Sequence, residues 1–466
     1  MVAANAYPSY RDSGLPWAPK IPEGWQVLRN GRLFSHRVET GFPDLPILEV
    51  SLRTGVRVRD MENLKRKQVI SQKEKYKRAA KGDIAYNMMR MWQGAVGPAP
   101  VDGLVSPAYV VVKPYPEANS AYFSYLFRTS AYMREVNKFS RGIVADRNRL
   151  YWESFKQMPS LVPPRAEQDQ IVAYLRAQDA HIARYILAKR ELIKLLTEQK
   201  LTIIDHAVTR GLDPNVRLKP SGIEWLGEVP EHWEVQRLKN VANVVLGKML
   251  TTETKGGDGD FKPYLRSTNV QWIKPDVRDV KEMWIAKAEM AQLRVRKGDL
   301  LVSEGGEVGR ACIWNDELPE CYIQNSVHRV AAKPMMLPEF LFHQFFVYGK
   351  RGRFNAIVNR VSIAHLTREK LVTIPFTVPP VKEQQAICRW ITDECQPLDD
   401  AITRAEEEIQ LIREYRDRLI ADVVTGQIDV RGWRPGPDDV VSDEELAALG
   451  DDEADLGEDE PGDDGE

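Results

Sequence analysis

Two long segments of the chain carry apolar residues at a seven-residue spacing, and each begins directly after a pair of prolines. The first follows Pro163-Pro164 and the second follows Pro379-Pro380. Proline suits the end of a strand and the entry to a helix, because it fixes its own backbone angle and lacks an amide hydrogen. Both segments are also rich in helix-forming residues. We therefore expect two long helices, over residues 164–212 and 380–428.

The apolar positions of the two predicted helices correspond one to one, with a separation of 216 residues in every pair. A seven-residue period is typical of the contact line of a coiled coil, so the simplest partner for each helix is the other one. The alternative is that each stripe packs only on its own neighbouring domain. Pro397 removes one helix hydrogen bond and predicts a kink or a fresh start in the second helix. The predicted contact line consists of Leu175, Ile182, Ile186, Ile193, Leu196 and Ile203, with Ile391, Leu398, Ile402, Ile409, Ile412 and Leu419 in the second helix.

The matching helices belong to an internal repeat. Residues Val162–Asp213 align without a gap onto Val378–Asp429, and 15 of the 52 aligned pairs are identical. Two ungapped blocks in the same order indicate duplication of one unit, with similar ends and a diverged middle of about 140 residues. The second block has an offset of 208 and matches Ser13, Gly14, Trp17, Pro22, Glu23 and Trp25 to Ser221, Gly222, Trp225, Pro230, Glu231 and Trp233.

Both diverged middles have the pattern of α+β domains with a twisted sheet. Short β-rich runs alternate with turn residues, and a Lys-Gly-Asp turn precedes a strand in each, at Lys81–Asp83 and at Lys297–Asp299. The predicted order of domains is a lead-in over residues 1–20, a first body over 21–163, the first helix over 164–212, a lead-in and second body over 213–379, the second helix over 380–428, and a tail over 429–466.

Charge is distributed unevenly along the chain. Residues 437–466 hold 15 acidic and no basic residues, whereas residues 1–436 hold 65 basic and 52 acidic residues. We expect the acidic tail to be disordered and the basic remainder to suit a polyanionic partner.

The basic excess is larger in the first body, which has 23 Lys/Arg against 13 Asp/Glu, than in residues 220–379, which have 22 against 19. Basic and amide side chains in loops contact phosphates and base edges, although each one can equally be a solvated surface group. The candidate DNA-contacting residues are Lys73, Lys75, Lys77, Arg78, Lys81, Arg141, Arg147 and Arg149 in the first body, with Arg266, Ser267, Asn269, Asn325 and Arg360 in the second.

Sequence signals for catalysis and metal binding are missing. The four cysteines form no Cys-x-x-Cys pair, and no His/Cys cluster has the spacing of metal ligands. Gly305–Arg310 lacks the Gly-Lys-Ser/Thr that completes a phosphate loop, and neither a Gly-x-Ser-x-Gly motif nor an Asn/Asp-Pro-Pro-Tyr/Phe methyltransferase motif occurs. No apolar run reaches 18 residues and no secretory signal is evident. We expect a non-catalytic, cytoplasmic protein without a metal or cofactor of its own.

The repeated motifs resemble those of the specificity subunits of type I restriction–modification systems. The resemblance covers the chain apart from its acidic tail. It is carried by Ser13-Gly14, Trp17 and Pro22-Glu23-Gly24-Trp25, by Ser221–Gly227 with Pro230–Trp233, by the Val-Pro-Pro and Glu-Gln motifs at Val162–Gln168 and Val378–Gln384, and by the ending Val424–Gly426.

This resemblance implies two target-recognition domains of mixed α/β structure, separated by two long helices that form an antiparallel coiled coil with a pseudo-twofold internal repeat. Each domain would read one half of a split target in double-stranded DNA. The helices would set the spacing and dock two methyltransferase subunits, which use S-adenosylmethionine. Two restriction and translocase subunits, which use ATP and Mg, would complete the complex. The alternative is a coiled-coil scaffold that joins two partner proteins without reading DNA.

Overall fold

The computed structural model describes residues 6–52, 55–59, 73–141, 148–254, 258–356, 365–439 and 449. These residues form two compact units. Unit 1 comprises residues 1–191 and 405–466, and unit 2 comprises residues 192–404. Both long helices therefore contribute to both units, because their ranges cross these limits.

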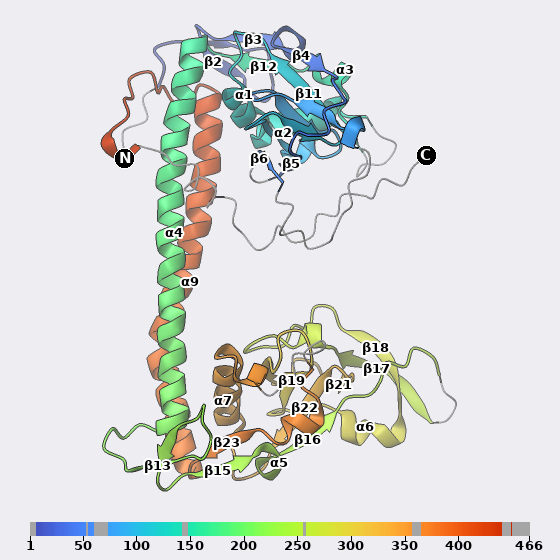
Figure 1. Ribbon diagram of the computed structural model, residues 1–466, viewed down its shortest axis with the longest axis vertical. Helices are drawn as coiled ribbons and strands as arrows, with labels where there is room; N and C mark the ends of the chain where they lie inside the picture. Colours follow the sequence, from blue (N-terminus) through green and yellow to red (C-terminus); the bar gives the residue numbers. More distant parts are fainter. Residues whose placement is uncertain are drawn as a thin grey trace. The chain divides into compact units, whose positions relative to one another are not determined.

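The centre of unit 1 is a four-stranded antiparallel sheet with the strand order β4-β11-β8-β9 (Figure 1). Its inner strand β8 is buried along its whole length, as expected for a continuous apolar run. Helix α1 begins at Asn119, whose side chain accepts hydrogen bonds from two amides of the first turn. Aromatic side chains from the sheet and helices, among them Phe34, Phe123 and Phe127, fill the core between them.

The elements of the first body are short. The strands are β1 (Tyr10–Asp12), β2 (Lys20–Pro22), β3 (Gln26–Arg29), β4 (Phe34–Arg37), β5 (Leu48–Ser51), β6 (Gly55–Val58), β7 (Lys77–Ala79), β8 (Ile84–Asn87), β9 (Val96–Pro98), β10 (Gly103–Val105), β11 (Tyr109–Pro114) and β12 (Pro159–Val162). The helices are α1 (Ser120–Phe127), α2 (Ser130–Phe139) and α3 (Trp152–Phe155).

Unit 2 repeats the same sheet, with the strand order β16-β22-β19-β20 and the same antiparallel pairing. Strands β8 and β19 are separated by 216 residues, which is the offset of the repeated helices. A three-stranded sheet, β18-β17-β21, is added in unit 2, and its β17 and β21 are parallel. The predicted α+β fold with an internal repeat is therefore confirmed.

The elements of the second body follow the same order. The strands are β13 (Leu218–Pro220), β14 (Glu228–Pro230), β15 (Glu234–Arg237), β16 (Ala242–Leu246), β17 (Gly259–Leu265), β18 (Lys281–Ala286), β19 (Leu300–Ser303), β20 (Ala311–Ile313), β21 (Tyr322–Ile323), β22 (Val327–Ala332) and β23 (Pro375–Val378). The helices are α5 (Leu238–Val241), α6 (Lys287–Leu293), α7 (Pro338–Lys350) and α8 (Arg368–Leu371).

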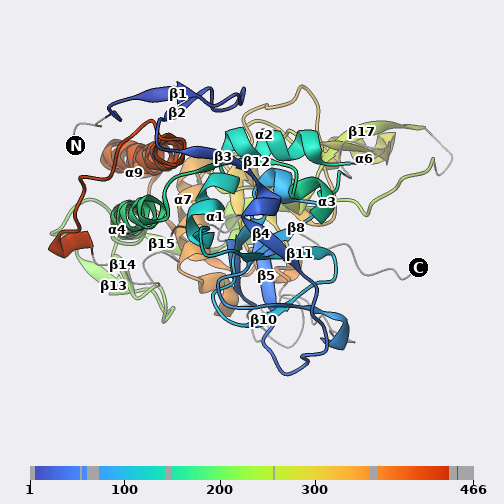
Figure 2. The ribbon, with the colours of Figure 1, turned by 90° about the horizontal axis from the view of Figure 1, so that it is seen from above.

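The two long helices, α4 (Arg165–Arg210) and α9 (Val381–Val424), pack side by side (Figures 1 and 2). In unit 1 the first half of α4 meets the last half of α9, where Arg416 Nε donates to Asp179 Oδ1 at 2.6 Å. In unit 2 the last half of α4 meets the first half of α9, where Lys200 Nζ donates to Asp399 Oδ1 at 2.5 Å. The helices are therefore antiparallel. Helix α9 continues through Pro397, so the predicted fresh start at this proline is wrong.

The repeated Trp and Glu residues connect each lead-in to the start of a long helix. Trp25 Nε1 donates to Glu167 Oε1 at 2.9 Å, and Trp233 Nε1 donates to Glu383 Oε1 at 3.0 Å. Both indoles are fully buried. Because an unpaired indole N–H is costly in a core, each buried tryptophan requires this acceptor.

The Gln after each Glu has an equally exact role. Gln168 accepts the amide of Asn119 at 2.8 Å and donates to the carbonyls of Pro163 and Glu117. Gln384 makes the three corresponding bonds to Leu337, Pro379 and Met335. Each glutamine thus ties the turn before the body's helix to the start of α4 or α9. This explains why the Pro-Pro and Glu-Gln motifs occur in both halves.

Candidate nucleic-acid interface

A buried aspartate organises the Lys-Gly-Asp turn of each body. Asp83 Oδ2 accepts from the amide of Ala80 at 2.9 Å and from Arg37 Nε at 2.5 Å. Burial raises the pKa of Asp83, although the arginine and the amide oppose this effect. Both turns contain a glycine at positive φ, Gly82 at 87° and Gly298 at 86°. Only glycine adopts this backbone region without strain.

In the second body, Asp299 takes the place of Asp83. Its Oδ2 accepts from the amide of Arg296 at 2.8 Å and from Arg329 Nη1 at 3.3 Å. The partner arginine comes from β22, whereas Arg37 comes from β4. The two bodies therefore share the turn but satisfy its buried charge from different strands.

The candidate basic residues before the first turn are held in different ways. Lys73 and Lys75 lie in the short 3-10 helix η2 (Lys73–Lys75), where Lys75 is exposed and Lys73 half-buried. The Lys77 ammonium donates to the Tyr109 carbonyl at 2.7 Å, and burial lowers its pKa. Lys81 is exposed at the tip of the turn.

Arg78 has carboxylate partners within its own body. It forms ion pairs with Glu39 at 3.2 Å and Asp102 at 2.7 Å, and its guanidinium lies 5.1 Å from the centroid of the Phe42 ring. These contacts use the side chain for structure. A phosphate contact by Arg78 would have to compete with both carboxylates.

Arg141 and Arg149 are brought together by the backbone. Each donates its amide to the carbonyl of the other, at 3.0 and 2.9 Å, and both side chains are exposed. The structure thus places two free-standing guanidinium groups on neighbouring segments. Arg147 and Arg360 lie outside the described residues.

The candidate loops of the second body follow the parallel strands β17 and β21 and meet each other. The amide of Ser267 donates to Ser326 Oγ at 3.0 Å, next to the half-buried Asn325. Arg266 Nη2 donates to Asp279 Oδ2 at 2.7 Å. Asn269 is buried, and its amide group donates to the carbonyls of Asp276 and Asp279. Asn269 therefore shapes the loop from inside.

Three residues near these loops were not among the sequence-based candidates. Trp272 Nε1 donates to Glu307 Oε1 at 2.6 Å, and Lys350 Nζ donates to the same oxygen at 3.0 Å. The Lys350 ammonium also lies 4.9 Å from the centroid of the Trp272 ring. The only sequence signal was the glycine-rich loop that holds Glu307, because Trp272 and Lys350 come from distant segments.

The predicted contact line of the long helices is shielded from solvent in both units. Five of its members are buried: Leu175, Ile182, Ile186, Ile391 and Leu419. The others are half-buried: Ile193, Leu196, Ile203, Leu398, Ile402, Ile409 and Ile412. Around this line, several apolar side chains of the helices remain exposed, namely Leu187, Leu192, Leu195, Leu411 and Tyr415.

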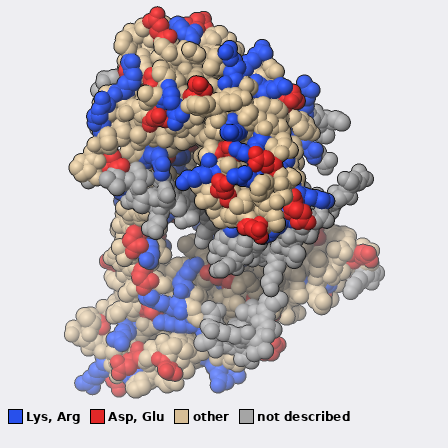
Figure 3. All heavy atoms as spheres, turned by 45° about the horizontal axis from the view of Figure 1, so that its top comes forward, with Lys and Arg blue, Asp and Glu red and all other residues tan. Residues whose placement is uncertain are grey.

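Basic and acidic side chains are interspersed over the visible surface of the body domains (Figure 3). Lys and Arg gather in several separate groups there, and no single continuous basic field covers the face. Within the described residues, no group of three or more His, Cys, Asp or Glu side chains is arranged to hold a metal ion. None of the described helices combines the length and the apolar character that crossing a bilayer requires.

Two α+β bodies joined to a pair of antiparallel helices, with differing polar loops on a shared scaffold, define the class of two-domain specificity proteins. Residues 230–411 match the family model described as the Type I restriction modification DNA specificity domain. The chain belongs to the family of type I restriction–modification specificity subunits, as its motifs predicted.

Several proteins and structures are similar to this chain. The MjaX specificity subunit of a type I restriction enzyme from Methanocaldococcus jannaschii is 22% identical over 330 residues, covering 70% of this chain and 71% of the relative. The MjaVIII specificity subunit of the same organism is 22% identical over 285 residues, covering 59% of this chain and 64% of the relative. A solved chain from work on complex assembly and conformational transition of the type I R-M system has the same fold, with a TM-score of 0.62, 16% identity, and coverage of 87% of this chain and 98% of that one.

Proposed function

We propose that this chain selects the DNA target of a methylation and restriction complex, with each body reading one half of a split site. The observation that supports this most directly is the duplication itself. The two bodies share a sheet and an aspartate-centred turn, whereas their exposed loops differ. Two related scaffolds with different loops suit two different half-sites.

In this proposal the paired helices set the distance between the half-sites. Helices α4 and α9 contain 46 and 44 residues. At 1.5 Å per residue they measure about 65–70 Å, which is a stiff spacer on the scale of two turns of duplex DNA.

The exposed apolar side chains on the helices are the proposed docking points for two methyltransferase subunits. Leu187, Leu411 and Tyr415 belong to unit 1, and Leu192 and Leu195 belong to unit 2, so each unit presents one set. Exposed apolar groups on a helix favour a protein partner. The catalytic work would lie in these subunits, with their S-adenosylmethionine, and in two ATP- and Mg-dependent restriction subunits. Together with DNA they place the complex in the cytoplasm.

The primary test is to co-express the chain with the methyltransferase encoded beside it and to map methylated adenines across the host genome. We expect one motif made of two specified halves and an unspecified gap. Substituting the loop residues Arg266 and Asn325 by Ala should relax one half only, whereas Arg141→Ala with Arg149→Ala should relax only the other. A continuous motif, or loss of both halves from one loop, would refute the proposal.

The spacer is tested by removing seven residues from each helix. The deletions lie between Lys189 and Lys200 in α4, and between Asp399 and Glu408 in α9, so that the heptad register is kept. The helix pair shortens by about 10 Å, and the gap in the methylated motif should shrink by about 3 base pairs. An unchanged gap in a folded, active complex would remove the spacer role.

The alternative function, a scaffold that joins two proteins without reading DNA, has a distinct signature. Phosphate contacts release counterions, so binding to duplex DNA weakens steeply as salt rises. A complex whose binding to DNA is absent at low salt would favour the scaffold.

A further inference from the structure

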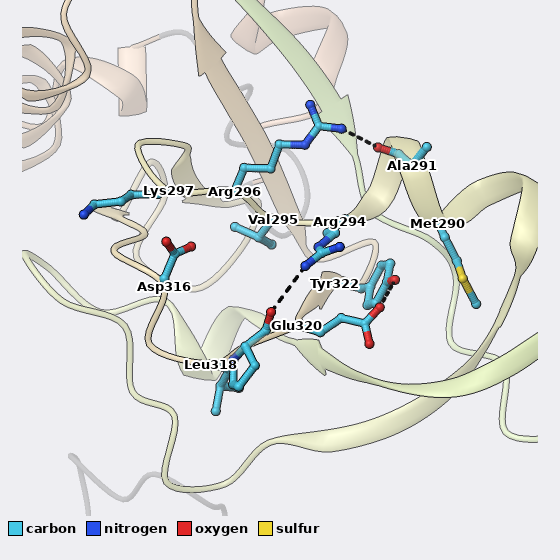
Figure 4. A pocket seen from close by; sticks show the side chains of 11 residues that line it. Met290, Ala291, Arg294, Val295, Arg296, Lys297, Asp316, Leu318, Glu320 and Tyr322 are labelled. Carbon is cyan, nitrogen blue, oxygen red and sulfur yellow. Dashed lines mark hydrogen bonds between the residues drawn. The ribbon is translucent and has the colours of Figure 1, made fainter.

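The second body contains a hollow of about 510 Å³ between helix α6 and the segment that follows strand β20. Figure 4 shows Arg294 beside Tyr322 and Glu320 in this pocket, with Arg296 reaching toward Ala291 and with Lys297 and Asp316 on another side. Arg294, Arg296 and Lys297 are all exposed to solvent. The pocket therefore has a basic, accessible wall.

The cationic groups of this pocket have no acidic partner among the described residues. Arg294 Nη2 donates to the Pro319 carbonyl at 3.3 Å, and Arg296 Nη2 donates to the Ala291 carbonyl at 3.4 Å. Both bonds are long and occupy one nitrogen of each guanidinium, which leaves further N–H groups free. Lys297 forms no ion pair with a described carboxylate.

The acidic residue nearest to Arg294 is already engaged elsewhere. Glu320 accepts from the Tyr322 hydroxyl at 2.6 Å and from Lys262 Nζ at 3.0 Å. These two contacts, the hydroxyl first, lower the pKa of Glu320. Because Lys262 balances Glu320, the pocket keeps an excess of positive charge even with Asp316 at its edge.

The first body shows what the same position looks like when it is closed. Arg78 precedes its Gly82 turn by the same number of residues as Arg294 precedes Gly298. The backbone of Arg78 faces β10, and that of Arg294 faces Tyr322 in the same antiparallel sense. Arg78 is neutralised by Glu39 and Asp102, whereas Arg294 has no such pair. One domain has thus closed with an ion pair what the other leaves open to an external anion.

We propose that the pocket of Arg294, Arg296 and Lys297 binds a phosphate oxyanion, and that the phosphate belongs to the backbone of the duplex read by the second body. Arginine forks fit phosphate oxygens with two parallel hydrogen bonds. Strand β21 leads directly from Tyr322 to the loop of Asn325, a distance of about 10 Å along an extended chain. A phosphate in the pocket would hold the duplex in register beside the candidate base-reading loops. This inference rests on the proposed function.

The test uses the complete complex with the methyltransferase and measures its affinity for duplex DNA at several salt concentrations. The double variant Arg294→Gln with Arg296→Gln should bind roughly 3–10-fold more weakly to target and non-target duplexes alike, and the slope of log affinity against log salt should fall in magnitude by about 1. The methylated motif should not change, because a phosphate contact positions the duplex without reading bases.

A charge-matched control is Arg237→Gln with Lys239→Gln, which removes two exposed cations of the same body outside the pocket. Its salt slope should stay within about 0.3 of the parent value, as expected for charges without a direct phosphate contact. Arg294→Lys with Arg296→Lys keeps the charge and should restore most of the slope. Equal slopes for the pocket variant and the control would overturn the proposal. Unfolding curves of all variants identify any loss of folding.

A second measurement separates the two sources of phosphate. Inorganic phosphate is titrated into the DNA-free complex and into the pocket variant, and heat or chemical-shift changes are followed. Millimolar phosphate binding that is lost in the variant, with an unchanged DNA salt slope, would make the pocket a small-anion site and refute the duplex as its ligand. A parent complex that binds no duplex at all would instead refute the proposed function.

Discussion

Units 1 and 2 join their bodies to the long helices at the same positions but with different polar groups. In unit 1 the joint is a buried charge pair with a hydroxyl. Asp179 accepts from Arg416 Nε at 2.6 Å and from the Tyr125 hydroxyl at 2.8 Å. Asp179 is 4% exposed. Such a pair is rigid, because losing either partner leaves a charge out of water and unpaired.

In unit 2 the offsets of the repeat place His343, Cys395 and Lys200 at these positions. Cys395 is buried and cannot balance a cation, so Lys200 turns to Asp399, which is 45% exposed. His343 Nδ1 is buried without a hydrogen-bond partner among the described residues. Duplication has kept the shape of the joint and replaced its chemistry. Each half-helix therefore matches the polar groups of its own unit only, which disfavours exchanged pairings.

The largest expected effects test where the two units are alike. Trp25→Ala and Trp233→Ala each remove a fully buried indole and its bond to a glutamate. We expect each to cost about 3–5 kcal/mol of unfolding free energy, confined to its own unit. Hydrogen exchange of peptides from each unit measures this in the full chain. Trp→Phe variants, which keep most of the volume, serve as controls. Strongly unequal losses would show that the two junctions are not equivalent.

The next effect tests where the units differ. Asp179→Asn leaves Arg416 without a counter-charge and should destabilise unit 1 by about 3 kcal/mol. Lys200→Met breaks only the partly exposed pair with Asp399 and should cost less than about 1 kcal/mol. Chemical denaturation with exchange readout compares the two variants. Similar losses would mean that the buried pair of unit 1 has no special role.

A smaller effect separates the two helix ends. Gly426 and Gly211 both have φ of +75°, so alanine is strained at either position. A Cβ on Gly426 would also lie 2.4 Å from a Pro22 ring carbon, whereas on Gly211 the nearest atom is a Trp233 ring carbon at 3.2 Å. We expect Gly426→Ala to cost about 2 kcal/mol and Gly211→Ala about 1 kcal/mol. Melting temperatures of the paired variants check the order, which should not reverse.

The smallest effect is a pH dependence of unit 2. Burial, assisted by the charge of Lys200, lowers the pKa of His343 from 6.5 to about 4. The unfolded chain therefore takes up a proton between pH 6.5 and 4 that the folded chain refuses, so stability falls as pH decreases through this range. We expect unit 2 to lose about 1–2 kcal/mol between pH 7 and pH 5 through this residue.

The control for this dependence is His343→Phe, which has no proton to gain. Its unit 2 should show a flatter pH profile than the parent, while unit 1, which has Tyr125 at this position, should respond equally in both proteins. An identical profile of unit 2 with and without His343 would contradict the assignment.

Much of the architecture was predictable because it is written in local patterns. The seven-residue spacing and the flanking prolines predicted both long helices, and α4 and α9 begin and end within a few residues of the expected limits. The repeat predicted two similar bodies. The binding residues were harder, because chemical type alone does not distinguish a free arginine such as Arg141 from Arg78, whose carboxylate partners come from other strands.

The sequence by itself determined that two related α+β bodies alternate with two amphipathic helices, since periodicity and internal repetition are properties of neighbouring and aligned residues. Only the tertiary structure decided that unit 1 combines the first half of α4 with the last half of α9, and that Asp179 meets Arg416 across 237 residues of chain. Pairings of this kind depend on which buried surfaces and charges complement each other in space. No local pattern specifies that complementarity.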